Sequence, residues 1–245
     1  MPKVVSKEEL QQRFNDHRLM SMNQLEELFP EHKIDEFQFR FLKKGYRNVT
    51  VFDIESINFD ARLGFVICWY AKRWDVLTGK TEMVYDRLEV EDMKKGYKSK
   101  NFDFDYRILG TLMQELQQAD IVAGHYISKF DLPYVTMRNN LTGQPENNPK
   151  YNDFKVMDTW RIMKMKHNAY NSGGNSLRNA GYIINGHDDK TSVDLSIWKT
   201  MYYVSHPKWK PYRKYICDHC ELDVIQNYDV FLDLANRVPI GGSSV

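Results

Sequence analysis

Two carboxylates stand at the end of an apolar stretch, residues 49–56, that has the composition of a buried β-strand. Asp53 and Glu55 are two residues apart, so on an extended chain both side chains point to the same face. Two anions on one face repel each other and resist burial, so the face is either solvated or holds a cation. Carboxylate oxygens suit Mg²⁺ or Mn²⁺. On its own the pair fits a strand that ends in a solvated acidic loop. Whether it is instead part of a cation site depends on other residues of the chain.

Two more carboxylates and one histidine follow along the chain. Asp131 begins a predicted helix after a short apolar strand, where it either complements the helix dipole or serves as a ligand. His219 and Asp223 are four residues apart on the predicted last helix and share one face of it. A surface pair is the alternative for these two. Because ligands collect at strand ends of α/β sheets, we expect the four carboxylates to lie together.

Three segments in this order resemble the DEDD superfamily of 3′–5′ exonucleases, which have the ribonuclease H-like fold. They are Val-Phe-Asp-Ile-Glu at 51–55, Ala-Asp-Ile-Val-Ala-Gly-His-Tyr-Ile-Ser-Lys-Phe-Asp-Leu-Pro at 119–133 and His-Cys-Glu-Leu-Asp-Val at 219–224. Residues 156–159 and 175–177 are similar to the connecting segments of family-B DNA polymerase proofreading domains. Each motif is weak alone, and their order and spacing make the resemblance specific over roughly residues 48–236.

The resemblance implies a two-metal hydrolysis of phosphodiester bonds that releases nucleoside 5′-monophosphates. Two Mg²⁺ or Mn²⁺ ions would be held by four carboxylates, with Asp53 bridging both ions, Glu55 and Asp223 completing one site, and Asp131 the other. His219 would orient or activate the attacking water.

The chain departs from the motifs at two positions. His219 stands where the branch with this four-residue spacing usually has tyrosine, and the position of the sister branch's histidine is occupied by Asp218. Tyr126 stands where the family usually has asparagine. For substrate binding we expect contacts from Tyr126, Tyr134 and the 170–176 loop with Asn175 and Ser176; Trp160 fits core packing better than base stacking.

The expected fold is α/β: a ribonuclease H-like mixed five-stranded sheet, with an antiparallel meander plus parallel strands, flanked by helices. The expected strands cover residues 49–56, 63–71, 81–85, 121–124 and 154–158. We expect an N-terminal helical arm at 1–48, the exonuclease domain at 49–236 and a flexible tail at 237–245. Residues 89–104 are predicted to be irregular, with a lysine-rich loop at 94–100 that is solvated or follows a phosphate backbone. Helices at 195–203 and 211–217 are expected to precede the last helix.

Composition narrows the choice of compartment and partner. Lys+Arg number 34 against 33 Asp+Glu, so a nucleic acid can bind only if the basic residues are segregated on one face. Cys68, Cys217 and Cys220 are too few for a disulfide framework, which favours a reducing, cytoplasmic compartment. Cys217 and Cys220 are only half of a zinc site and are expected to be buried helix residues. No apolar run is long enough to predict a membrane partner.

These observations predict a metal-dependent 3′–5′ exonuclease that acts on single-stranded DNA 3′ ends, alone or in trans with replication or repair proteins. An RNA exonuclease of the same fold is the first alternative. A catalytically weak nucleic-acid-binding module and a structure-specific endonuclease are the others.

Overall fold

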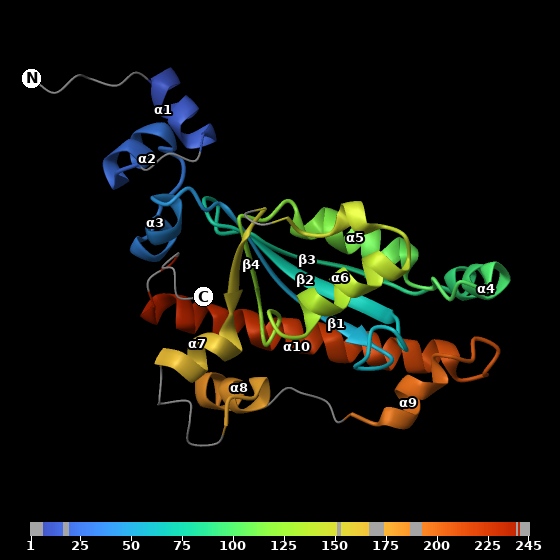
Figure 1. Ribbon diagram of the computed structural model, residues 1–245. Helices are drawn as coiled ribbons and strands as arrows, with labels where there is room; N and C mark the ends of the chain where they lie inside the picture. The colour runs from blue at the N-terminus through green and yellow to red at the C-terminus, as the bar shows by residue number, and fades with distance from the viewer. Residues whose placement is uncertain are drawn as a thin grey trace, which may run out of the picture.

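A mixed five-stranded sheet forms the centre of the protein (Figure 1). The computed structural model describes residues 7–16, 20–150, 153–166, 174–186, 193–238 and 240. The strands are β1 (Asn48–Ser56), β2 (Val66–Asp75), β3 (Thr81–Arg87), β4 (Ile121–Gly124) and β5 (Lys155–Asp158). Their order is β3-β2-β1-β4-β5, with β1, β2 and β3 antiparallel and β4 and β5 added in parallel. The expected fold class, an antiparallel meander continued by parallel strands, is confirmed.

The central strand β1 is longer than its parallel neighbour. Pairing between β1 and β4 ends at Val51 opposite Ala123, so the chain from Asp53 to Ser56 extends past the end of β4. Val51 is buried on one face and Phe52 on the other, as the two-residue period of a strand requires. The odd-numbered carboxylates therefore share the face of Val51, at the open end of the sheet.

Ten α-helices and one short 3-10 helix surround the sheet in the described part of the chain. They are α1 (Lys7–Asn15), α2 (Met22–Leu28), α3 (Glu36–Leu42), α4 (Val90–Ser99), α5 (Tyr106–Leu116), α6 (Asp131–Leu141), η1 (Pro145–Asn147), α7 (Thr159–Lys166), α8 (Leu177–Asn185), α9 (Leu195–Thr200) and α10 (Trp209–Arg237). None of these helices is both long enough and apolar enough to cross a bilayer.

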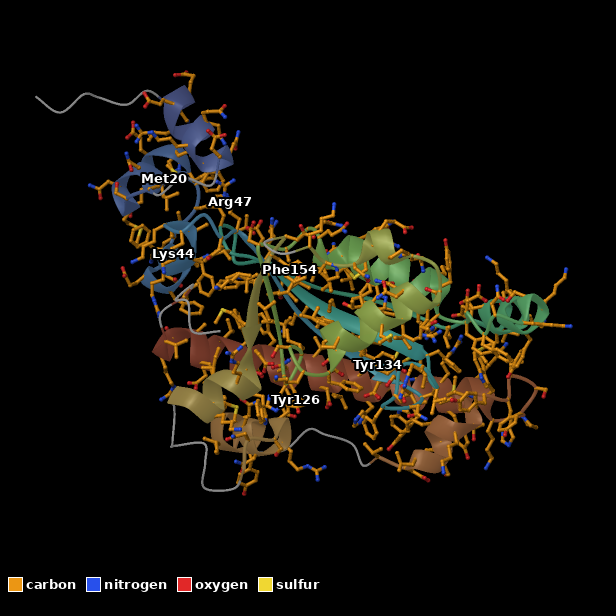
Figure 2. The ribbon with its side chains drawn as sticks, in the orientation of Figure 1. Met20, Lys44, Arg47, Tyr126, Tyr134 and Phe154 are labelled. Carbon is orange, nitrogen blue, oxygen red and sulfur yellow. The ribbon has the colours of Figure 1, made fainter. Side chains whose placement is uncertain are left out.

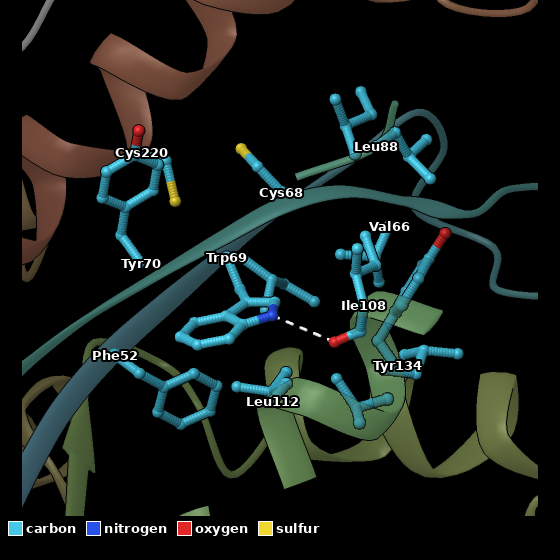
Figure 3. Packing of buried hydrophobic residues seen from close by; sticks show 14 of the residues in the cluster. Phe52, Val66, Cys68, Trp69, Tyr70, Leu88, Ile108, Leu112, Tyr134 and Cys220 are labelled. Atoms are coloured by element: carbon cyan, nitrogen blue, oxygen red, sulfur yellow. Dashed lines mark hydrogen bonds between the residues drawn. The ribbon is translucent and has the colours of Figure 1, made fainter. Parts of the chain in front are cut away.

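Strand β2 separates two helical layers (Figure 3). Cys68 and Tyr70 lie on the side of α10, where Cys220 lies, whereas Trp69 points to α5. The Trp69 indole donates a 3.0 Å hydrogen bond to the carbonyl of Ile108 on α5. Apolar residues on both faces of one strand are the pattern of a sheet covered on both sides.

The N-terminal helices pack onto the end of the sheet opposite the carboxylates. Phe41 of α3 lies edge-on to Trp74 of β2 at 5.1 Å and against Phe231 of α10 at 6.2 Å. Figure 2 shows Lys44 and Arg47 at the junction between these helices and the sheet. The Lys44 ammonium donates to the carbonyl of Ile240, which is buried, so this residue of the predicted flexible tail is packed. Residues 241–245 lie outside the described residues.

Three expected boundaries are wrong. Residues 90–99 form helix α4 instead of an irregular loop, because Gly96 and Met93 pack into the core, with Gly96 against the ring of Phe104. The segment 211–217 is the start of the 29-residue helix α10, since Pro211 lies in its first turn, where no intrahelical N–H bond is lost. The second strand runs over 66–75 instead of 63–71.

Candidate active site

All five predicted catalytic side chains line one cleft of about 590 Å³ at the end of β1. Asp53 and Glu55 come from β1, Asp131 from the first turn of α6, and His219 and Asp223 from the middle of α10. Three elements that are distant in sequence therefore bring four carboxylates and one imidazole to the same cavity.

His219 lies between two of the carboxylates. Its Nε2 atom is 3.7 Å from Oε1 of Glu55 and 3.9 Å from Oδ2 of Asp223, and the residue is only 4% exposed. The contact with Asp223 follows from the four-residue spacing on α10. His219 can therefore exchange a proton with a water or a carboxylate inside the cleft.

Trp198 is a residue of the site that the sequence did not reveal. Its indole N–H donates a 3.0 Å hydrogen bond to Oε2 of Glu55, and its ring stands edge-on to the His219 ring at 5.8 Å. Trp198 thus fixes the positions of both side chains. It lies on α9, 143 residues after Glu55, and no spacing rule connects the two.

Asp131 connects α6 to β1. Its Oδ1 atom accepts a 3.2 Å hydrogen bond from the backbone N–H of Ile54, beyond the point where β4 could supply a partner. Burial raises the pKa of Asp131 to about 7, and the negative charge of Asp158 contributes in the same direction. A carboxyl in such a position is readily protonated when no cation is nearby.

The loop between β4 and α6 is held by Asp158, which is fully buried. One carboxylate oxygen accepts from the N–H groups of Tyr126 and Arg161 at 3.1 and 3.2 Å, and the other from the N–H of Ser128 at 3.0 Å and from its hydroxyl. The bond from Arg161 makes Asp158 the cap of α7, and Asp158 also fixes the loop. A Cβ atom on Gly124 would lie 2.1 Å from Ile127, so only glycine fits there.

The structure brings only one of the four expected substrate contacts to the cleft. Tyr126 lines it with 42% of its surface exposed, at a positive φ of 68° and edge-on to Trp160 at 4.9 Å. Tyr134 is 4% exposed and does not line the cleft, because its position on α6 turns it into the core. Tyr134 instead lines a neighbouring groove that shares Phe59 and Phe130 with the cleft, so a substrate contact by Tyr134 stays a prediction.

Asn175 and Ser176 do not line the cleft either. The Ser176 hydroxyl accepts from the N–H of Asn179 at 3.1 Å and caps the N-terminus of α8. The sequence signal at Ser176 is therefore that of a helix start. Residues 170–173 of the same predicted loop lie outside the described residues.

The three cysteines are buried beside the site. The Cys220 sulfur lies 3.5 Å from the carbonyl oxygen of Asp53 and 3.7 Å from its Oδ2 atom. Burial and the charges of Asp53, Glu55 and Asp223 raise the pKa of the Cys220 thiol. All three cysteines are free and buried, in agreement with the expectation for Cys217 and Cys220.

The donor set of the cleft fits Mg²⁺ or Mn²⁺ in its chemistry, because it consists of carboxylate oxygens on rigid elements. Among the described residues, no three His, Cys, Asp or Glu side chains already surround one metal-binding position.

The comparisons with known proteins identify no family. No protein-family model matches the chain, and no curated protein does. Among solved structures, the chain is similar to the family B DNA polymerase from the hyperthermophilic archaeon Pyrobaculum calidifontis, with a TM-score of 0.47 and 16% identity. The match covers 77% of this chain and 24% of the polymerase, so this chain spans about a quarter of the polymerase's length. The residues of the cleft are therefore the basis for a function of this chain.

Proposed function

We propose that this chain is a metal-dependent 3′–5′ exonuclease that hydrolyses the terminal phosphodiester bond of single-stranded DNA and releases nucleoside 5′-monophosphates. One observation carries the proposal: Asp53, Glu55, Asp131, His219 and Asp223 leave three separate elements and line the same cleft. The helix-dipole and surface-pair alternatives explain each residue alone, but neither explains why all five converge.

The carboxylates of Asp53, Glu55, Asp131 and Asp223 are the residues that would hold divalent cations. When bound, two such ions neutralise the negative charge that develops on the attacking and leaving oxygens of the phosphodiester. Without ions, four carboxylates in one cleft would repel the phosphate of a substrate.

The chain's own contribution is to position a water and to handle its proton. His219 Nε2, between Glu55 and Asp223, is the atom at which we place that proton. Trp198 keeps Glu55 and the imidazole in fixed orientations through its hydrogen bond and its ring contact. A positioned general base contributes about 10²–10⁴-fold to a rate.

Aromatic side chains at the cleft give a place for the terminal bases. Phe59, Tyr126 and Phe130 line it, and the first two are exposed. Stacking of bases on such rings tolerates any sequence, as an exonuclease requires.

A nucleic-acid-binding module without catalysis is the second candidate. The open arrangement of the carboxylates favours it, because an ion is not pre-positioned by the side chains. An RNA exonuclease would differ from the main proposal in its substrate. An endonuclease would differ in cutting within the strand instead of shortening it from the 3′ end.

The test is degradation of one oligonucleotide carrying a label at either end. With Mg²⁺ or Mn²⁺, a 5′-labelled DNA strand should give a ladder that shortens step by step from its 3′ end, and EDTA should abolish it. A 3′-labelled strand should release labelled mononucleotide as its first product. Internal fragments from the 3′-labelled strand would indicate an endonuclease, and absence of cleavage on DNA and on RNA with both metals would favour the binding module.

A further inference from the structure

Basic residues are concentrated in two segments of the chain. Residues 195–217 contain no Asp or Glu, and residues 93–102 contain none either. Together these segments carry Lys94, Lys95, Lys98, Lys100, Lys199, Lys208, Lys210, Arg213 and Lys214. A net charge of +1 for the whole chain therefore conceals a strong local excess of positive charge.

The fold brings the two segments together. The Tyr97 hydroxyl of α4 donates to the carbonyl of Tyr202, which follows α9. Arg213, in the second turn of α10, donates to the carbonyl of Leu88 and to Glu89, the N-cap of α4. Figure 1 shows α4, α9 and the start of α10 at the same end of the molecule, away from the N-terminal helices.

Most of these charges are not neutralised by the protein. Lys214 pairs with Asp218 and Arg213 with Glu89, but the other seven lysines form no ion pair with a carboxylate of the described residues. All seven are exposed. We call them the basic ridge: Lys94, Lys95, Lys98, Lys100, Lys199, Lys208 and Lys210.

The arginines elsewhere in the chain behave differently. Many of them are held by nearby carboxylates, as in the pairs Arg73–Glu115 and Arg107–Asp92. Their charge is compensated within the protein, whereas that of the basic ridge is not.

The basic ridge is continuous with the cleft and carries exposed rings. Lys199 lines the cleft next to Trp198. Tyr97, Phe102 and Tyr203 are each at least 42% exposed among the lysines. Unpaired lysines interleaved with exposed aromatic rings are the features that bind a single-stranded nucleic acid, since they contact its phosphates and its bases.

We propose that the basic ridge binds the phosphate backbone of the strand whose 3′ end lies in the cleft, on the side away from the terminal nucleotide. This inference rests on the proposed function for its choice of partner. It predicts that affinity grows with strand length, because a longer strand reaches more lysines, and that binding needs no metal.

The test compares two variants that lose equal charge. The ridge variant is Lys94→Gln/Lys98→Gln/Lys208→Gln/Lys210→Gln. The control variant is Lys7→Gln/Lys33→Gln/Lys80→Gln/Lys150→Gln, in which all four lysines are also exposed but lie elsewhere. Circular-dichroism melting curves confirm that both variants fold.

Binding of fluorescein-labelled DNA and RNA strands of 3 and 20 nucleotides is followed by anisotropy in EDTA. For the 20-mer we expect the ridge variant to bind at least about tenfold more weakly than the control variant. The slope of log K against log[salt] should fall by about 3, at about 0.7 for each lost phosphate contact. The advantage of the 20-mer over the 3-mer should shrink in the ridge variant alone.

The outcomes separate this inference from the proposed function. Equal loss of affinity in both variants overturns the proposal that the basic ridge binds the strand, whatever the cleavage assay gives. No binding of DNA or RNA by the wild-type protein overturns it as well. Weaker binding by the ridge variant, together with no cleavage under any metal condition, supports the basic ridge and refutes the exonuclease.

Discussion

Substitution of Asp158 by asparagine tests how the loop that carries Tyr126 is held. Asp158 accepts four hydrogen bonds from groups of three residues, Tyr126, Ser128 and Arg161. An asparagine keeps one acceptor oxygen and replaces the other by an NH₂ group, which only donates. Because each carboxylate oxygen accepts two of these bonds, the amide can retain only one pair; keeping the pair from Tyr126 and Arg161 costs less, since the Ser128 hydroxyl can rotate to accept from the NH₂ group.

The expected cost follows from counting these groups. The Ser128 hydroxyl can rotate and accept from the new NH₂ group, but the Ser128 N–H is left facing a donor, which costs about 1–3 kcal/mol. The two retained bonds lose their charge assistance, and neutral bonds are about half as strong. Loss of the repulsion between Asp158 and Asp131 offsets part of this. We expect a net loss of about 2–3 kcal/mol in the free energy of unfolding.

Equilibrium unfolding in urea measures this value. The matched control is Asp75→Asn, which changes a carboxylate that caps an exposed turn through Leu77 and Thr78 and should cost less than about 1 kcal/mol. If Asp158→Asn and Asp75→Asn destabilise the protein equally, the reasoning about Asp158 is refuted.

Three further predictions concern separate parts of the structure. Trp198→Phe removes the donor to Glu55 but keeps a ring, so kcat should fall about tenfold, as expected for one lost hydrogen bond to a charged group; because Trp198 is buried in the core, the melting temperature should fall as well. Burial raises the pKa of Asp131 from 3.8 to about 7, so in the metal-free protein its stabilising contribution is complete below 3.8 and is lost as the pH rises through 7. An ion must displace that proton below pH 7, so the rise in melting temperature produced by Mn²⁺ should be larger at pH 8 than at pH 5.5. Arg138→Met leaves the buried carboxylate of Asp105 without its bidentate partner and should cost about 3–5 kcal/mol in urea unfolding.

Each of these predictions has a control. Trp69→Phe removes an equally buried indole donor on the face of the sheet opposite to the carboxylates and should lower stability to a similar degree without lowering kcat. In Asp131→Asn the pH dependence of the Mn²⁺ effect should disappear; if it persists, another group is responsible. Arg237→Met breaks an exposed pair, with side chains 54% and 22% exposed, and should cost less than about 1 kcal/mol.

The parts of the fold that could be predicted from the sequence are those fixed by local periodicity. Strand β1 alternates between two buried faces, and its pairing places Asp53 and Glu55 past the end of β4. The spacing of His219 and Asp223 on α10 fixes their contact wherever that helix packs. These local rules place Asp53 with Glu55 and His219 with Asp223; the packing of α6 and α10 against β1 then brings all five predicted catalytic residues to one cleft.

The parts that could not be predicted depend on contacts between distant segments. Helix α4 has a lysine-rich sequence, and its two buried residues are Met93 and Gly96. Gly96 packs against the ring of Phe104, a contact that the sequence of the helix alone does not predict. Trp198 gains its role from Glu55, a residue of another element. Tyr134 was expected to contact substrate as an aromatic residue, but its position on α6 turns it into the core.

The most direct test of the central claim is the rate of 3′-end shortening in two variants of α10. Asp223→Asn removes a carboxylate of the cleft, whereas Asp218→Asn removes one that pairs with the exposed Lys214 on the same helix. If the cleft is a metal-dependent hydrolytic site, Asp223→Asn should lose at least about 10²-fold in kcat, and Asp218→Asn should stay within about twofold of the wild type. Equal rates in the two variants, with both folded, would contradict the assignment of this cleft as the active site.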